Sequence, residues 1–458
     1  MLRDRRGVTS LMFGVGAVGA ISLAGLATEG GTWYLERRHG QNAADAAAIA
    51  GALALAGGET NAAAITDATS IATANLYTSG TSNGTTTTVA VSNVTYNNQQ
   101  GVQVVVTRSQ PRLFSALFLT DNISISETAV AVIAANGSNA CVLGLSGGLS
   151  FAGSTSINAS NCALASNAKG PNSISFTGNK ATVTNGLLIA EGGCSNCGNA
   201  PGYATYQPPT TNPFKSIYDP TTGTGLTMPS FTGSQCLSIP TVRGTAGAPT
   251  TLTPWTQGSQ VAYCGTGNGN GSTLKVTGGA YLNFLPGTYF FQNASLDFNG
   301  GAVECTTCTP GGAGVTIILT GTSASKIGTI SVGGNANVTL NAPVTNTWCH
   351  AVGTGCNPNT SFDGVLFYMS NVAQPTNGKG NAPVSLSGNG TVQLTGGMYF
   401  PTVNVTYSGN VAASNAAVAC TVIVAEALDF TGNSTLSIAG CGADGTPVPL
   451  PQSVQLAQ

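Results

Sequence analysis

Charged side chains are scarce in this chain. Asp, Glu, Lys and Arg make up 7% of its 458 residues and leave a net charge of −2. Proteins that bind nucleic acid neutralise phosphates with a basic surface, and the fourteen lysines and arginines present are too few to build one. We therefore expect no nucleic-acid partner. The solubility of any exported part has to come from Ser, Thr, Asn and Gly.

Paired carboxylates and histidines are also lacking. A polysaccharide-cleaving site needs two carboxylates as acid and base. Asp297 and Asp429 each precede a Phe-x-Gly turn and could stack on one face, but they are more simply residues that enter a strand. His350 lies between Cys349 and Cys356, in a loop that a disulfide would close. We predict no catalytic residue, no metal site and no cofactor, and hence no enzyme.

Cysteine is absent from the first 140 residues, whereas all twelve cysteines lie between Cys141 and Cys441. An even number confined to one region indicates a disulfide framework in an oxidising compartment, outside the cytoplasm. The motifs CSNC and CTTC have the spacing of redox or zinc sites, but they occur in Gly-rich loops, and we interpret them as structural disulfides. Connectivity is not fixed by sequence; the local pairs would be Cys141 with Cys162, Cys194 with Cys197, Cys236 with Cys264, Cys305 with Cys308, Cys349 with Cys356, and Cys420 with Cys441.

No charged residue occurs from Gly7 to Thr28, and a mostly apolar run of this length can span a bilayer as a helix. Basic residues at 3–6 favour a cytoplasmic N-terminus. Basic residues at 37–39 make that bias ambiguous, and the exported cysteines resolve it. We predict a cytoplasmic basic tip and transmembrane helix at 1–28.

Two kinds of processing would change this anchor. A prepilin peptidase cleaves after a glycine such as Gly7, but the fifth mature residue would then be Met12, where pilins carry Glu. Signal peptidase could instead cut after Ala27 and release the chain. We expect an uncleaved anchor.

Residues 29–140 have the pattern of a membrane-proximal α+β unit. Residues 33–58 are rich in Ala and continue the helix. Residues 60–77 repeat apolar side chains at helical spacing, ending on Leu76. Period-two runs then flank residues 97–100 as a hairpin, and a third strand follows the apolar segment PRLFSALFL.

A degenerate repeat dominates residues 141–446. An apolar strand, a glycine turn and a second strand recur every 21 to 25 residues in SFAGSTSI, SLSGNGTVQL, TYSGNVAA and DFTGNSTLSI, among others. This period predicts stacked parallel strands, and we interpret the region as a disulfide-stapled, right-handed parallel β-helix (solenoid). The alternative is a β-sandwich. The fold class is therefore mainly β.

Residues 198–260 interrupt the repeat with nine prolines and scattered aromatic residues. We expect a long insertion tethered by Cys236 and Cys264, and the alternative is a binding loop. Residues 447–458 are expected to be a C-terminal tail.

The N-terminal pattern resembles a known family. It consists of RRG, Glu29-Gly30-Gly31, Tyr34-Leu35, Arg37-Arg38 and QNAADAAAIAGA (41–52). Over residues 5–56 these motifs resemble the N-terminal domain of TadG-like Flp (tight adherence) pilus-assembly proteins. The chain departs from the family at Glu29, where Asp is common, and at Gly40, where an apolar residue is usual. Segments such as GVTIILTGTS and FDGVLFY resemble the extracytoplasmic region of such proteins.

The resemblance implies a non-enzymatic, membrane-anchored envelope protein of Flp/Tad pilus assembly or surface adhesion. It implies a single-pass protein of the bacterial inner membrane whose C-terminal part is periplasmic or on the cell surface. Its partners would be other Tad/Flp pilus components, and surface glycans or a host surface. Gln41, Asn42 and Asp45 of the motif are candidate contact residues. The alternatives are a polysaccharide-active β-helix enzyme and a secreted passive β-helix adhesin.

Overall fold

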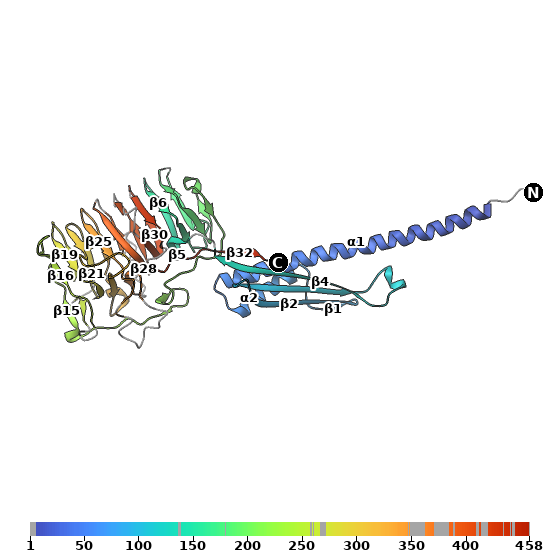
Figure 1. Ribbon diagram of the computed structural model, residues 1–458, viewed down its shortest axis with the longest axis horizontal. Coiled ribbons are helices and arrows are strands. Elements are labelled where there is room, and N and C mark those ends of the chain that lie inside the picture. Colours follow the sequence, from blue (N-terminus) through green and yellow to red (C-terminus); the bar gives the residue numbers. More distant parts are fainter. Residues whose placement is uncertain are drawn as a thin grey trace, which may run out of the picture. The chain divides into compact units, whose positions relative to one another are not determined.

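The computed structural model divides into two compact units (Figure 1). Unit 1 comprises Met1–Ala135 and Gln452–Gln458, and unit 2 comprises Asn136–Pro451. The structure describes residues 6–457 with these gaps: 136–138, 179, 257–258, 260, 266–271, 347, 349–361, 371–383, 388–389, 409–411, 414–419, 434, 440 and 442–444.

Two helices begin unit 1. Helix α1 (Arg6–Ala56) runs for 51 residues without interruption. Helix α2 (Asn61–Ala74) is capped by Thr60, whose hydroxyl accepts a hydrogen bond from the Ala63 amide. Helix α2 ends before Leu76, which adopts a positive φ of 70° and is 82% exposed. Helical spacing therefore places Leu76 wrongly on the buried face, because the helix ends two residues earlier.

A five-stranded antiparallel sheet completes unit 1. Its strands, in spatial order, are β1 (Gly80–Ser82), β2 (Thr85–Tyr96), β3 (Gln99–Gln110), β4 (Ile123–Ala135) and β32 (Gln452–Leu456). Asn97 and Asn98 both adopt positive φ in the tight turn between β2 and β3. Residues 447–458 are expected to be a tail, whereas within them β32 pairs with the C-terminal residues Ala131–Ala135 of β4 and covers the edge of that strand.

Small side chains let the helices of unit 1 pack closely on each other and on the sheet. Ala44, Ala48 and Ala52 of α1 are fully buried with Ala64 and Ala68 of α2. Gly51 of α1 lies so close to α2 and to Val102 of β3 that an added Cβ would be 3.0 to 3.2 Å from atoms of both. The Ala-rich motif therefore forms the core of this unit.

Unit 2 is built around a 21-stranded sheet whose described pairings are all parallel. This pairing is inconsistent with the antiparallel β-sandwich alternative. Along β17 to β25 each strand pairs with the third strand after it, so the chain returns to the same ladder after every three strands. The expectation of a mainly β chain with one long apolar helix and a large parallel sheet is confirmed.

The chain enters the stack in its middle and builds it in two arms. The first arm contains β5 (Ala140–Ala152), β6 (Ser156–Ser160), β7 (Ala163–Ser166), β8 (Ile174–Thr177), β9 (Thr182–Thr184), β10 (Leu187–Ala190), β11 (Cys194–Ser195) and β12 (Tyr203–Ala204). The second arm contains β15 (Cys236–Ser238), β16 (Thr250–Leu252), β17 (Ala262–Cys264), β18 (Thr273–Val276), β19 (Tyr281–Phe284), β20 (Gly287–Gln292), β21 (Ser295–Phe298), β22 (Ala302–Glu304), β23 (Val315–Thr320), β24 (Ile330–Val332), β25 (Asn337–Asn341), β26 (Val365–Met369), β27 (Val384–Leu386), β28 (Val392–Tyr407), β29 (Ala412–Ala413), β30 (Thr421–Phe430) and β31 (Thr435–Ala439).

The last strands of the second arm return to the start of the first. Strand β30 pairs with β5, Leu428 opposite Leu149, while β5 pairs with β7 on its other side. One end of the stack is therefore β12 and the other is β15. The Pro-rich segment 205–235, which carries the hairpin of β13 (Tyr218–Asp219) and β14 (Thr224–Gly225), connects those two ends.

This connection is packed against the strands of the stack rather than raised from them. Phe214, Tyr218 and Phe231 are at most 8% exposed. Phe214 packs on Tyr399 of β28, and Phe231 packs on Phe290 of β20. The buried aromatic residues favour a structural connection over the alternative of a projecting binding loop.

Aromatic columns and disulfides hold the stack. The rings of Phe176, Phe151 and Phe430 stack at centroid distances of 4.6 and 5.1 Å across β8, β5 and β30. Five of the expected local pairs are disulfides: Cys141–Cys162, Cys194–Cys197, Cys236–Cys264, Cys305–Cys308 and Cys420–Cys441. Cys349 and Cys356 lie outside the described residues.

Candidate membrane-proximal site

The first half of α1 carries large apolar side chains that no other part of unit 1 covers. Phe13 is 79% exposed and Leu23 is 71% exposed, and the exposed apolar residues continue to Leu26. The hydroxyls of Ser22 and Thr28 donate to carbonyls of their own helix, at 2.8 Å each. A helix that satisfies its own polar groups and presents apolar side chains outward suits a hydrocarbon environment. It is the one candidate membrane span among the described helices.

A buried carboxylate follows this apolar half directly. Glu29 is 1% exposed. It accepts hydrogen bonds from the amides of Leu113 and Ser115 at 2.9 and 2.7 Å, and from the Ser115 hydroxyl at 2.9 Å. All three donors belong to the connection between β3 and β4, which forms a short 3₁₀ turn at Ser115–Leu117. Glu29 therefore fixes this connection to α1.

Glycine at position 25 lets the same connection touch the helix one turn earlier. A Cβ added at Gly25 would lie 2.4 Å from the ring of Phe114, which leaves no room for a side chain. Arg112 stands 5.8 Å from the Trp33 ring and donates to the carbonyl of Asp121. The connection is thus held at three successive turns of α1.

A second polar cluster joins α1 to the sheet farther from the apolar half. Arg108 of β3 donates to Glu36 at 2.8 Å and lies 4.3 Å from the centroid of the Tyr77 ring. The Tyr77 hydroxyl donates to the same carboxylate at 2.6 Å. Burial and this hydrogen bond raise the pKa of Tyr77. The cluster is satisfied internally and acts as a structural clasp.

The motif residues occupy different environments. The Gln41 amide donates to Asp45 at 2.7 Å and to the Thr128 carbonyl of β4 at 3.3 Å. Asn42 is exposed. Gln41 thus helps to dock α1 on the sheet while Asp45 holds its amide within the helix, and Asn42 is the motif residue that faces outward from unit 1.

Sequence reasoning missed Glu29 and Arg108 as parts of this site. Glu29 was notable only as a departure from the family pattern. The signal available was an acidic residue at the very end of a long uncharged run, next to two glycines. Its partners lie 84 and 86 residues away, so only the fold identifies them.

Asp297 and Asp429 of unit 2 do not form an acid–base pair. The register runs from Asp297 through Ser331, Ser385 and Thr406 to Asp429, so the two acids share one column four strand steps apart. Four steps correspond to about 19 Å, beyond the separation of paired catalytic carboxylates. His350 lies outside the described residues. The described residues also contain no cluster of three metal-ligating side chains.

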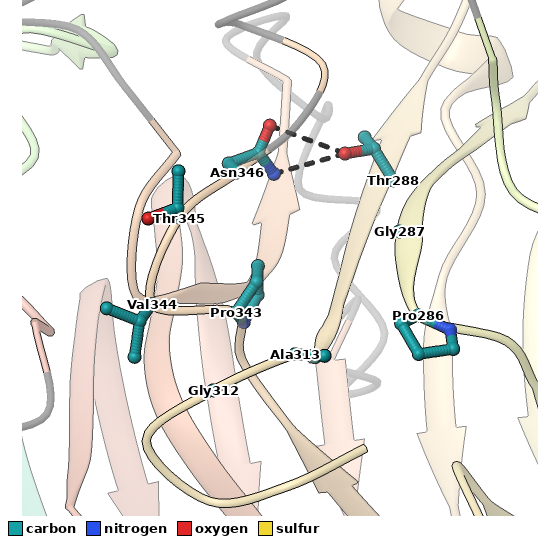
Figure 2. A pocket seen from close by; sticks show the side chains of 10 residues that line it. Pro286, Gly287, Thr288, Gly312, Ala313, Pro343, Val344, Thr345 and Asn346 are labelled. Atoms are coloured by element: carbon teal, nitrogen blue, oxygen red, sulfur yellow. Dashed lines mark hydrogen bonds between the residues drawn. The ribbon is translucent and has the colours of Figure 1, made fainter. Parts of the chain in front are cut away.

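A hollow of about 300 Å³ in unit 2 has no ionisable lining (Figure 2). Pro286, Ala313 and Val344 form part of its wall, and Asn346 faces Thr288 across it. The Asn346 amide donates to the hydroxyls of Thr288 and Thr316 at 3.1 and 2.8 Å. This buried asparagine ties neighbouring strands together, and the hollow offers no group for acid–base chemistry.

Residues 7–75 match the model of the Tad family, described as Flp pilus-assembly TadE/G-like. The matched region spans nearly all of α1, all of α2, and the two carboxylates Glu29 and Glu36, whereas the partners of these carboxylates lie beyond residue 75. The family that the sequence motifs indicate is thereby confirmed for this region. No curated protein matches the chain.

One similar solved structure is the competence-associated pilin ComZ from Thermus thermophilus. The identity is 9% and the TM-score 0.22, over 83% of this chain and 86% of that chain. A score this low supports no conclusion about fold or function.

Proposed function

We propose, from the premise that residues 7–75 form a TadE/G-like Flp pilus-assembly region, that this chain is a non-enzymatic, membrane-anchored envelope protein of Flp pilus assembly or surface adhesion. It spans the bacterial inner membrane once, through the apolar half of α1. Its N-terminus is cytoplasmic, and unit 2 is periplasmic or on the cell surface.

The uncovered apolar half of α1 carries this proposal. Side chains such as Phe13, Val18 and Leu23 would be exposed to water without a bilayer. The helix that carries them continues directly into the packed core of unit 1. The transfer of each such side chain out of water is favourable by about 2 kcal/mol of free energy. The partition of cysteine supports the orientation, because unit 2 contains disulfides and unit 1 has no cysteine.

The proposed role of unit 2 is that of a rigid, right-handed parallel β-helix. The three-strand return of the chain, the parallel register and the aromatic columns support a solenoid. Its two arms meet at β5 and β30, which makes the stack continuous through the point where the chain enters it. A rigid stack of this kind presents a long polar surface to a glycan, a host surface or a pilus component.

Asn42 is the proposed contact with another Tad/Flp component. It lies in the most specific part of the family motif, and it is exposed while its neighbours Gln41 and Asp45 are bonded within unit 1. Substitution of Asn42→Arg should weaken pilus formation without unfolding unit 1. Thr66→Arg on the exposed side of α2 provides a matched control.

The test begins with deletion of the gene and counts of Flp pili and of cells attached to a surface. Both counts should fall, and the intact gene should restore them. Unchanged pili and unchanged attachment would overturn the proposal. In the complemented strain, a tag is placed after Gln458 and protease is added from outside. The tag should be cleaved on whole cells if unit 2 is on the cell surface, or only after the outer membrane is permeabilised if unit 2 is periplasmic. A tag that is cleaved only after the inner membrane is opened would contradict the orientation. The mass of the mature protein tests the anchor, since a start at Thr28 would show release.

A further inference from the structure

We propose that the β3–β4 connection, residues 111–122, inserts into the leaflet on the unit 1 side of the same bilayer that α1 spans. The chain would then hold the membrane at two places, one a transmembrane helix and the other a shallow apolar loop. The inference rests on the proposed anchoring by α1.

The connection presents four large apolar side chains that nothing in unit 1 covers. Leu113, Leu117 and Phe118 are 68%, 75% and 79% exposed, and Leu119 is 51% exposed. No charged residue interrupts the sequence from Leu113 to Leu119. A continuous apolar surface of this kind marks an interaction site in a folded protein.

The depth of the connection is fixed by its contacts with α1. Phe114 packs on Gly25, and the amides of Leu113 and Ser115 bond to Glu29. Gly25 lies three residues inside the end of the uncharged run, or about 4.5 Å along the helix. The connection is therefore level with the boundary of the proposed span, where its apolar side chains meet the headgroup and acyl region.

The buried Glu29 carboxylate supplies hydrogen-bond acceptors for backbone amides of the connection, which would lack partners near lipid. Amides outside a helix or closed sheet lack partners once water is removed, and their burial is unfavourable unless a protein group accepts them. Glu29 accepts hydrogen bonds from the Leu113 amide and from the amide and hydroxyl of Ser115, the residue that begins the 3₁₀ turn. The same carboxylate thus positions the loop and satisfies its polar groups.

The surroundings of the connection favour lipid over a protein partner. The exposed apolar surface of α1 from Met12 to Leu26 adjoins it at Gly25. Arg112 of the connection itself lies beside Trp33, and farther along α1 Arg38 lies 5.9 Å from the centroid of the exposed Tyr34 ring. Aromatic and basic side chains in this position are characteristic of a membrane–water interface.

The experiment places a fluorescent probe on the loop of the full-length protein in phosphatidylcholine vesicles. Phe118→Trp reports on the connection. Tyr96→Trp is the matched control, because Tyr96 ends β2 at the opposite end of the same strands, about 36 Å from that connection. Each variant is compared with the parent, whose three tryptophans give the background. The lipids carry bromine on the acyl chain either near the headgroup or near the bilayer centre.

Bromine near the headgroup should lower the emission added by Phe118→Trp roughly twofold, and bromine at the centre should lower it less. The emission added by Tyr96→Trp should not change. Resistance of the protein to carbonate extraction separately reports the α1 anchor. If carbonate extracts the protein, α1 is not a membrane anchor and the proposed function fails with it. If the protein resists extraction but bromine does not quench Phe118→Trp, only the inference about the loop is overturned.

Two further variants keep the outcome decisive. Leu117→Trp replaces Phe118→Trp if the latter fails to fold, and it should be quenched in the same way. Adding Glu29→Ala to Phe118→Trp should reduce the quenching, because the loop loses three hydrogen bonds to α1. Blue-shifted emission that bromine does not quench would mean that protein, such as a second copy of the chain, covers the loop, and would overturn insertion into lipid.

Discussion

In unit 1 the long helix meets its neighbours through alanine and glycine, and at Gly51 the backbone of α1 comes within contact distance of α2 and β3. In unit 2 the interior is filled by rings such as Phe151, Phe176 and Phe430, which stack across successive strands. Unit 1 contains no cysteine, while five disulfides are described in unit 2. The two units thus reach dense packing by opposite means.

The difference follows from what each unit has to bring together. A helix packs on a sheet and on a second helix through close backbone approach, which small residues allow. A stack of short parallel strands leaves a wide interior, and large rings fill it while disulfides close its loops. Unit 1 should therefore be sensitive to added volume, and unit 2 to lost volume or lost cross-links.

The largest effect is expected from removing a ring at the junction of the two arms of unit 2. Phe151→Ala should destabilise unit 2 by about 4 kcal/mol, since the ring is fully buried between Phe176 and Phe430. Calorimetry of the full chain should show a lower unfolding temperature for unit 2 and an unchanged unfolding temperature for unit 1. Phe151→Leu, which keeps most of the volume, should have a smaller effect. Equal shifts of both transitions would contradict separate cores.

A disulfide should contribute somewhat less. Replacing Cys141 and Cys162 together with alanine should destabilise unit 2 by about 3 kcal/mol, because the bridge closes a loop of sequence separation 21 at β5, the strand by which the chain enters the stack. Thiol titration verifies that no other cysteine is released. Reduction of the intact chain should lower the unfolding temperature of unit 2 further and leave that of unit 1 unchanged. Any loss of stability in unit 1 on reduction would contradict the view that only unit 2 depends on disulfides.

A larger side chain in the core should destabilise unit 1, where the close approach of α1, α2 and β3 leaves no room for it. Gly51→Leu should destabilise it by about 2 kcal/mol, because even a Cβ there would be 3.0 Å from Val102 and 3.2 Å from Ala68. Ala62→Leu, on the exposed side of α2, is the control and should change little. Urea unfolding followed by helix content measures both. Tolerance of Gly51→Leu would show that α1 and α2 pack loosely.

Local patterns predicted the elements well, because their causes are local. The uncharged run and the alanine-rich motif locate α1, and the recurring glycine turns indicate stacked parallel strands. The end of α2 was misplaced at Leu76 because spacing alone cannot locate a helix terminus.

Long-range partners were beyond the sequence. Nothing near Leu428 indicates that it pairs with Leu149, since that register depends on the chain crossing between the ends of the stack and returning. The aromatic residues of 205–235 likewise show their structural role only once Phe214 is seen against Tyr399. Glu29 remained unexplained for the same reason, because its three donors are remote.

The smallest effect separates the two carboxylates that share a column of unit 2. Burial raises the pKa of Asp429, which faces Thr406 and Ser150 in the register and has no cation among these neighbours. A raised pKa in the folded state means that ionisation at neutral pH disfavours folding; stability is gained as pH falls toward the unfolded pKa near 3.8. Asp429→Asn should therefore stabilise unit 2 at neutral pH, by up to about 0.5 kcal/mol, and lose that advantage in acid. Asp297→Asn should bring no gain, because Lys275 lies 3.7 Å from that carboxylate. Unfolding midpoints across the acidic to neutral range measure the pair, and equal behaviour of the two variants would mean that burial at Asp429 does not matter.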